Sequence, residues 1–345
     1  MALKPPVEVP QGAIRLNTDS QKLEFFAQDQ WWEMATEPSS PLGGGRGACF
    51  AGANPGAPFI AMDNIDYVTI ATQGNATDFG DIGTPTKSGM ACGSVTRGFY
   101  FGGVTPTYVN TIEFITWSST GNATNFGDLS ETVRIGAGAN SSTRALRIGG
   151  GTAAAAKNTI DYWTMTSSGN AIDFGDLAMG GSQYCEGTSN PILAVGHKWN
   201  DGNGRLDYVT IATTGNALEF GGLSPRHDTG AMTGSTTTRG FFAGGYSPGE
   251  PEAGRNKISY ILWASKGKNT GFGELRHHRW ETQGGSAASP TRIVWMGNGG
   301  GSNTGGETHI DYINPNTEGD AVDFGDLSVE RWSAPTSSNT NGGTL

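Results

Sequence analysis

Apolar and polar positions along the chain follow one pattern that returns six times. Each copy opens with about six residues rich in β-branched and aromatic side chains, passes through Thr-Gly-Asn or a similar triplet, and ends on a short segment containing phenylalanine. A fixed spacing of this kind indicates a repeat architecture. The apolar residue that opens each copy lies 14 positions before the phenylalanine: Ile65 and Phe79, Ile112 and Phe126, Ile160 and Phe174, Leu206 and Phe220, Ile258 and Phe272, Ile310 and Phe324.

Each copy predicts a β-hairpin. β-Branched and aromatic residues favour a strand in the first half, and the glycine of the triplet, which readily adopts a positive φ, favours a tight turn. The phenylalanine supplies bulk in a short second strand, and the glycine after it indicates a β-bulge or a close backbone approach. The first strand is apolar on both alternating faces, as expected of a small sheet packed between neighbouring sheets.

Asp-Phe-Gly, as in residues 173–175, is also the magnesium-binding tripeptide of protein kinases. In three of the six copies the aspartate is replaced by Asn125, Glu219 or Gly271. Glycine has no side chain with which to bind magnesium, and one active site does not need six such motifs. The tripeptide is therefore a scaffold element.

A second motif lies between the hairpins, a strand closed by one or two glycines as in TRGFYFGG at residues 96–103. A segment of small residues precedes it and predicts a strand in a crowded place. Four strands in roughly 50 residues, repeated six times, favour an all-β, six-bladed β-propeller; a parallel β-solenoid, which usually has shorter repeats, is the alternative. An arginine opens five of the glycine-closed strands, which favours a structural bridge between blades: Arg46, Arg97, Arg144, Arg239 and Arg292.

The order of glycine-closed strand, loop and aromatic hairpin resembles the kelch repeat. The glycine pairs at residues 102–103, 149–150 and 244–245 match the kelch diglycine. Phenylalanine stands where kelch blades usually carry tryptophan, and Gly52, Gly196 and Gly297 keep only the first glycine. The resemblance implies a kelch-like propeller over residues 43–345.

The ring needs a strand to complete its first blade. The segment RWSAPTSS near the C-terminus has the small-residue character of an innermost strand, so we expect closure by a strand near residues 328–340. Residues 31–41 align loosely with 279–290 and compete for the same place.

Residues 1–42 lie outside the repeat, and their alternation predicts a small β-hairpin module. The stretch PQGAIRLNTDSQKLEFFAQDQWWEM at residues 10–34 resembles a module of tail-fibre and other virion proteins of tailed phages. The TGNATDFGDL hairpins are similar to kelch-like repeats in structural proteins of marine phages, cyanophages especially. These resemblances imply an attachment module joined to a virion protein.

The amino-acid composition limits the classes of partner that the chain can bind. The net charge of −10 argues against nucleic acid or an anionic membrane as the main partner. Three cysteines at wide spacing, Cys49, Cys92 and Cys185, form no metal or disulfide pattern and are predicted to be buried thiols. The opening residues contain no apolar segment of the secretory type, so we expect folding in the host cytoplasm and a final location in the virion.

Variable loops after the glycine-closed strands define the expected binding face, because loops that change between repeats carry function. Aromatic side chains beside polar ones suit a sugar ring or a protein hot spot, whereas a plain loop with a covering aromatic is the structural alternative. The candidate ligand-binding residues are His197, Lys198, Trp199, Asn200, Tyr246, Glu250 and Arg255.

No metal site, cofactor or catalytic motif is expected. The cluster RHHRW at residues 276–280 is expected on the face opposite the variable loops, and its adjacent histidines point in different directions on an extended chain. We therefore expect a non-enzymatic virion component of a tail fibre, baseplate or head appendage. Its partners would be other virion proteins, sister copies, and a host surface glycan or receptor. A glycan-processing propeller enzyme and a cytoplasmic kelch-type scaffold are the alternatives.

Overall fold

The computed structural model describes most of the chain and divides it into two compact units, Met1–Gly43 and Gly44–Leu345. Its described residues contain strands and no α-helix, which confirms the all-β class. None of them forms a helix with the length and apolar character needed to cross a bilayer. The described residues are 9–17, 22–33, 45–54, 59–178, 180–181, 184–198, 204–223, 227, 230–245, 256–279, 285–297 and 307–340.

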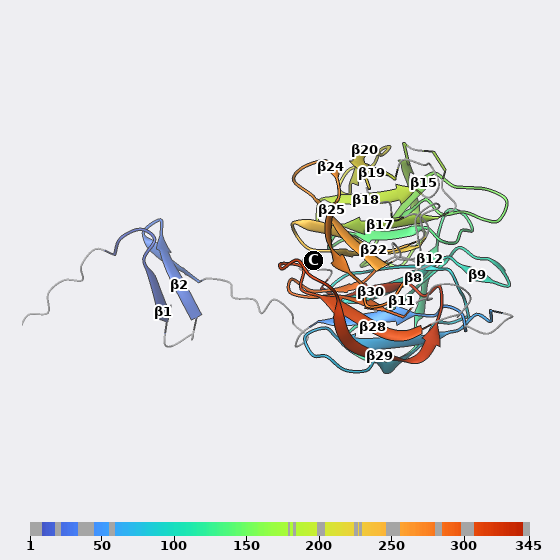
Figure 1. The fold of residues 1–345 in the computed structure, drawn as a ribbon. Helices are drawn as coiled ribbons and strands as arrows, with labels where there is room; N and C mark the ends of the chain where they lie inside the picture. Colours follow the sequence, from blue (N-terminus) through green and yellow to red (C-terminus); the bar gives the residue numbers. More distant parts are fainter. Residues whose placement is uncertain are drawn as a thin grey trace, which may run out of the picture. The chain divides into compact units, whose positions relative to one another are not determined.

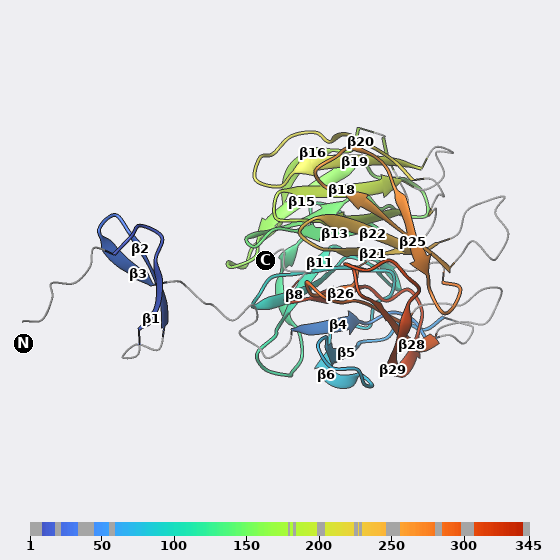
Figure 2. The same ribbon diagram turned by 60° about the vertical axis from the view of Figure 1, so that its left-hand side comes forward.

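The first unit is a three-stranded antiparallel sheet of β1 (Ile14–Asn17), β2 (Lys22–Ala27) and β3 (Gln30–Glu33) (Figures 1 and 2). On one face Arg15 pairs with Glu24 at 2.7 Å and lies 4.1 Å above the ring of Trp31. The register places five large apolar side chains together on the opposite face. All five are exposed: Ile14, Leu16, Leu23, Phe25 and Trp32.

The described part of the second unit contains six sheets, each with four main antiparallel strands that follow one another closely in the chain, except that the first sheet takes one strand from the C-terminal region (Figure 1). The first sheet contains β30 (Thr336–Ser338), β4 (Arg46–Phe50), β5 (Asn64–Thr69) and β6 (Thr77–Asp81). The second contains β7 (Met90–Gly93), β8 (Arg97–Phe101), β11 (Thr111–Thr116) and β12 (Thr124–Asp128). The third contains β13 (Ala137–Asn140), β14 (Arg144–Ile148), β15 (Thr159–Thr164) and β16 (Ile172–Asp176).

The remaining three sheets repeat the same order of strands. The fourth contains β17 (Cys185–Ser189), β18 (Leu193–Lys198), β19 (Arg205–Thr210) and β20 (Leu218–Gly222), with β24 (Gly267–Lys268) added in parallel at its edge. The fifth contains β21 (Ala231–Ser235), β22 (Arg239–Gly244), β23 (Lys257–Leu262) and β25 (Thr270–Glu274). The sixth contains β26 (Ala287–Ala288), β27 (Ile293–Met296), β28 (Glu307–Ile313) and β29 (Val322–Arg331). A separate ribbon joins β9 (Val104–Thr105) and β10 (Thr107–Tyr108).

The first sheet joins distant parts of the chain. Its strand β30 comes from the C-terminal region and pairs antiparallel with β4 through Thr336 and Cys49. Trp31, part of the competing segment, lies in β3 of the first unit instead.

The glycine after each repeated phenylalanine meets both predictions made for it. In the third sheet Ile160 pairs with Gly175 and the next residue pairs with Asp173, so Phe174 is the extra residue of a bulge. The same shift occurs in all six hairpins. A Cβ atom on Gly175 would lie 2.5 Å from the carbonyl oxygen of Gly215, in the turn of the next sheet. The glycine therefore gives the neighbouring turn room to approach.

The recurrent arginines bridge neighbouring sheets, as the sequence predicts. Arg97 donates from Nη1 to the Met165 carbonyl of the next sheet at 2.9 Å, and its guanidinium lies over the Phe114 ring. Arg292 of the sixth sheet donates in the same way to the Ile70 carbonyl of the first. The other three follow the pattern: Arg46 to Trp117, Arg144 to Ile211, and Arg239 to Pro315.

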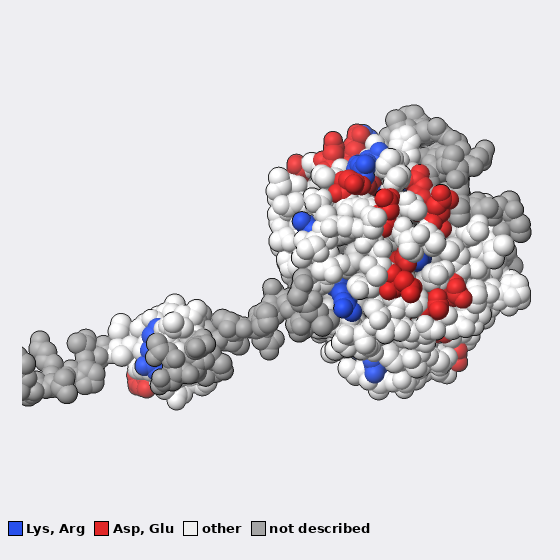
Figure 3. Space-filling view, turned by 90° about the horizontal axis from the view of Figure 1, so that it is seen from below, with Lys and Arg blue, Asp and Glu red and all other residues white. Residues whose placement is uncertain are grey.

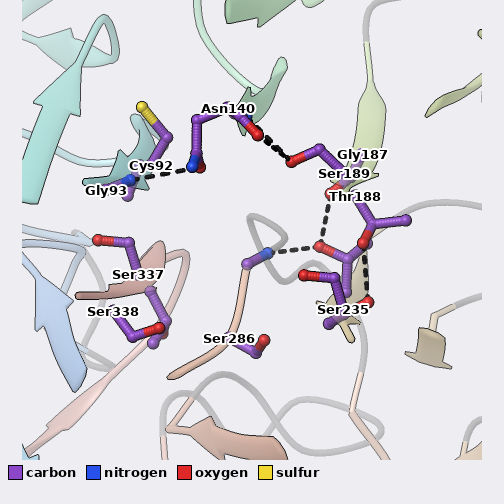
Figure 4. Close-up of a pocket in the computed structure, with 16 residues that line it drawn as sticks. Cys92, Gly93, Asn140, Gly187, Thr188, Ser189, Ser235, Ser286, Ser337 and Ser338 are labelled. Carbon is purple, nitrogen blue, oxygen red and sulfur yellow. Dashed lines mark hydrogen bonds between the residues drawn. The ribbon is translucent and has the colours of Figure 1, made fainter. Parts of the chain in front are cut away.

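The hydrophobic core lies between neighbouring sheets. One cluster combines Leu146 and Phe174 of the third sheet with Val209 and Ala217 of the fourth. Burial on both faces explains why the first hairpin strand is apolar on both alternating sets of positions. The small-residue strands are also buried: β7, β13, β17, β21 and β30, together with Ser286 just before β26, line one narrow pocket (Figure 4).

Candidate functional site

The predicted ligand-binding loop contains a buried histidine. His197 is not exposed to solvent, because it belongs to β18 and pairs with Glu186 of β17. At Gly297 the closing glycine takes a φ of 59° and turns the chain, whereas Gly196 keeps φ outside the positive range, so β18 continues. The expectation that His197 lies in an exposed binding loop is therefore wrong. The backbone of Lys198 ends β18; five other candidates lie outside the described residues: Trp199, Asn200, Tyr246, Glu250 and Arg255.

His197 belongs to a buried polar network between the fourth and fifth sheets. Its Nδ1 lies 3.3 Å from Glu186, which also accepts the Gly230 backbone N–H at 2.6 Å. His227 donates from Nδ1 to the Gly244 carbonyl at 2.7 Å and accepts at Nε2 from the Ser259 hydroxyl. Burial lowers the pKa of His227 to about 4, which keeps this histidine neutral. Among the described residues, His197 Nε2 is the one ring nitrogen of the two histidines without a hydrogen-bond partner. Because His197, Glu186 and His227 are all buried, the network is not open to a ligand from solvent.

The pocket where the six innermost strands meet is too small for an organic ligand. Its volume is about 30 Å³, which leaves room for a few water molecules at most. Hydrogen bonds link its walls, such as Asn140 N–H to Ser189 Oγ at 3.0 Å and Thr188 Oγ1 to the Gly234 carbonyl at 2.7 Å (Figure 4). We assign this pocket a structural role.

A larger pocket, of about 150 Å³, lies in the second sheet beside Glu113. In the third sheet the matching carboxylate, Asp161, binds Arg147, whose guanidinium also donates to the Gly149 and Thr159 carbonyls. In the second sheet Tyr100 occupies the strand position of that arginine.

Within residues 59–178, no arginine binds Glu113. The pocket beside Glu113 corresponds to the position that the Arg147 guanidinium occupies beside Asp161 in the third sheet. Gly102, Thr111 and Glu113 line it, so its chemistry suits a small cationic group such as a guanidinium or ammonium ion. The carboxylate is held by the Gly83 N–H, which lies 3.1 and 3.2 Å from its two oxygens.

Burial raises the pKa of Glu113, and the Gly83 N–H opposes this shift. Because the folded state binds the proton more tightly, the carboxyl stabilises the fold below its ordinary pKa. This contribution is lost as pH rises through the folded-state pKa. We expect Glu113→Gln to raise the unfolding midpoint by about 2 °C near neutral pH and to have little effect near pH 4. Thermal unfolding at both pH values checks this, with the exposed Glu219→Gln as control. An equal shift at both pH values would contradict it.

A second cluster gathers two histidines and a carboxylate. His277, in the link after β25, stacks on His309 of β28 with ring centroids 4.4 Å apart and 13° between the planes. The nearest nitrogen and oxygen atoms of His277, Glu307 and His309 all lie within 4.8 Å of one another. These three residues are the histidine cluster. On the opposite side of His309, Nδ1 lies 3.3 Å from Asp326 Oδ1.

The segment that contains His277 was expected on the face opposite the variable loops, and this expectation is wrong. In an antiparallel four-stranded sheet, the connection from the second to the third strand leaves from one end, and the link between sheets arrives at that same end. His277 of the link therefore meets Glu307 and His309, which open β28 directly after the connection from Gly297. The cluster lies on the same side as the variable loops.

Comparison with models of known protein families gives no match, and comparison with curated protein sequences gives no significant match either.

Proposed function

We propose that the chain is a non-enzymatic structural component of a tailed-phage virion, belonging to a tail fibre, baseplate or head appendage. In this proposal the six sheets are the blades of a kelch-like propeller, and the first unit attaches that propeller to the particle or to sister copies. The variable loops would face a host glycan or receptor.

The propeller proposal is supported by hydrogen bonds that join each sheet to the next and the sixth sheet to the first. In five of the six hairpins the turn glycine donates to the phenylalanine carbonyl of the preceding sheet, as Gly169 does to Phe126 at 2.9 Å. In the fifth hairpin the turn strand β24 pairs with β20 of the preceding sheet. Gly74 of the first sheet donates to Phe324 of the sixth at 2.9 Å. A series of sheets that bonds its last member to its first is the arrangement expected of a propeller.

The attachment role rests on the exposed apolar face of the first unit. Ile14 is 63% exposed and Leu16 is 59% exposed, and they lie beside Phe25 and Leu23 respectively. A three-stranded sheet of this size needs a packed apolar face for stability. We infer that another protein surface covers this face. The exposure of these apolar side chains is the observation that supports the attachment role.

The charge distribution supports protein or glycan partners. Asp and Glu outnumber Lys and Arg on the face drawn in Figure 3, in keeping with the net charge of −10. Negative charge disfavours phosphate backbones and anionic lipids.

Virion incorporation tests the proposal. We expect the full chain in purified virions by quantitative mass spectrometry and immunogold labelling. Leu16→Glu is expected to lower its abundance there about 10-fold or more, because burying a leucine contributes about 1.5–3 kcal/mol.

Leu218→Glu is the matched control, since Leu218 of β20 is 61% exposed in the second unit. Absence of the wild-type chain from virions would overturn the virion role. Normal incorporation of Leu16→Glu would overturn the attachment role of the apolar face while leaving the virion role intact.

A further inference from the structure

We propose that the histidine cluster, His277, Glu307 and His309, binds a divalent transition-metal ion, with Zn²⁺ the best match. This site is independent of the virion role. It lies where the link from the fifth sheet to the sixth, which carries His277, meets the start of β28, which carries Glu307 and His309.

The backbone holds the three side chains in place. Glu307 and His309 are two residues apart in β28, so strand alternation directs both to one face. Arg279, two residues after His277, is fully buried and donates to the carbonyls of Gly297 and His309 at 2.6 and 3.1 Å. It also pairs with Asp311 at 2.9 Å. This clamp fixes the link against the start of β28.

Asp326 determines which nitrogen of His309 is available. Its carboxylate is 3.3 Å from His309 Nδ1 and accepts that N–H, while the Thr308 hydroxyl donates to the same oxygen at 3.0 Å. The lone pair of His309 is then on Nε2, which lies 3.9 Å from Glu307 Oε2. A carboxylate that orients a histidine from its far side is the usual outer partner of a metal-bound imidazole.

Two atoms of the cluster are buried without a hydrogen-bond partner in the described part of the chain. They are His277 Nε2 and Glu307 Oε2. A buried polar atom without a partner costs free energy, and a carboxylate oxygen costs more than a neutral group. One cation between them would satisfy both atoms.

Two imidazole nitrogens and one carboxylate oxygen select the class of metal. Zn²⁺ and its neighbours in the first transition row bind this set, whereas Mg²⁺ and Ca²⁺ prefer all-oxygen sites. Ligand atoms around tetrahedral Zn²⁺ lie about 3.4 Å apart, given bonds of about 2.0–2.1 Å. The ligand atoms therefore need to approach one another by up to about 1.4 Å. Because the two imidazole rings are stacked in nearly parallel planes, one of them must also rotate so that both nitrogen lone pairs point at the ion. Three protein ligands leave the fourth position to water.

Isothermal titration of the tag-free, EDTA-treated full chain with ZnCl₂ tests the site. We expect one ion per chain, His277→Ala to weaken binding about 100-fold or more, and Asp326→Asn to weaken it about 10- to 100-fold. Tetrahedral Co²⁺ absorption is expected for the wild type and lost in His277→Ala.

His278→Ala is the matched control, because the neighbouring His278 lies outside the cluster and acts electrostatically on Glu274. Circular dichroism and the unfolding midpoint in EDTA establish that each variant folds. The three cysteines do not compete, since all are buried and free, as predicted, and burial raises the pKa of Cys49 to about 11. Absence of one-to-one binding, or binding by His277→Ala at wild-type affinity, would overturn the proposal.

Discussion

Replacing Gly273 by alanine is expected to lower the free energy of unfolding by about 3 kcal/mol, at the upper end of the range for overpacked sites. A Cβ atom at this position would lie 2.1 Å from the carbonyl oxygen of Gly319 and 2.5 Å from its carbonyl carbon. Both are backbone atoms, so a side-chain rotation cannot relieve the clash. The turn must move away, which also weakens the bond from the Gly319 N–H to the Phe272 carbonyl.

Gly271→Ala is the control, because it lies in the same strand and a Cβ atom there would have nothing within 4 Å. Alanine at an open strand position restricts the unfolded chain, so this variant is expected to be neutral or slightly stabilising. Urea unfolding of both variants measures the difference. Equal stability of the two would show that the close contact between sheets does not constrain the fold.

Arg147→Met is expected to cost about 3–5 kcal/mol, because it leaves the carboxylate of Asp161 buried without its cation. Both side chains are fully buried, and Arg147 Nη2 lies 2.7 Å from Asp161 Oδ2. The same guanidinium donates to the carbonyls of Gly149 and Thr159, so methionine removes one donor from each, and the Thr159 carbonyl keeps only the Gly149 N–H at 3.1 Å.

The double variant Arg147→Met with Asp161→Leu separates the unpaired charge from the lost packing. Its stability is expected to recover by several kcal/mol relative to Arg147→Met, since an apolar pair of similar volume often replaces a buried ion pair without loss. Lys257→Met, which removes an exposed ion pair with Glu274, is the surface control and is expected to cost less than about 1 kcal/mol. A small effect of Arg147→Met, similar to that of the control, would contradict the prediction.

Local rules predicted the scaffold because most repeats obey them. The glycine after Phe174 was expected to mark a bulge or a close approach, and it does both. The arginine that opens the second strand was expected to form a bridge, and the carbonyl it reaches belongs to the next sheet. Because the motif occurs six times, an irregularity in one copy does not hide the pattern. The regular spacing of the copies is therefore enough to predict the order of the strands.

The candidate site could not be predicted as well, because it depends on departures from the repeat. Gly196 resembles the closing glycines in sequence, yet its backbone stays extended and draws His197 into a strand. His277 and His309 are far apart in the chain and meet only through the arrangement of two sheets. The available signal was a histidine at the start of the sixth hairpin, where Asn64, Thr111 and Thr159 open other copies.

The pairing of β30 with β4 has a consequence for synthesis of the chain. Arg46 donates its backbone N–H to Asn339, 293 positions later. At about 5–20 residues per second, a ribosome needs about 15–60 s to make the residues between them. For that time β4 presents an unpaired edge, which is a template for wrong pairing with other nascent chains. The sheet that begins the second unit is thus the last of its six sheets to be finished, and the yield of native protein depends on keeping that edge unoccupied until β30 emerges.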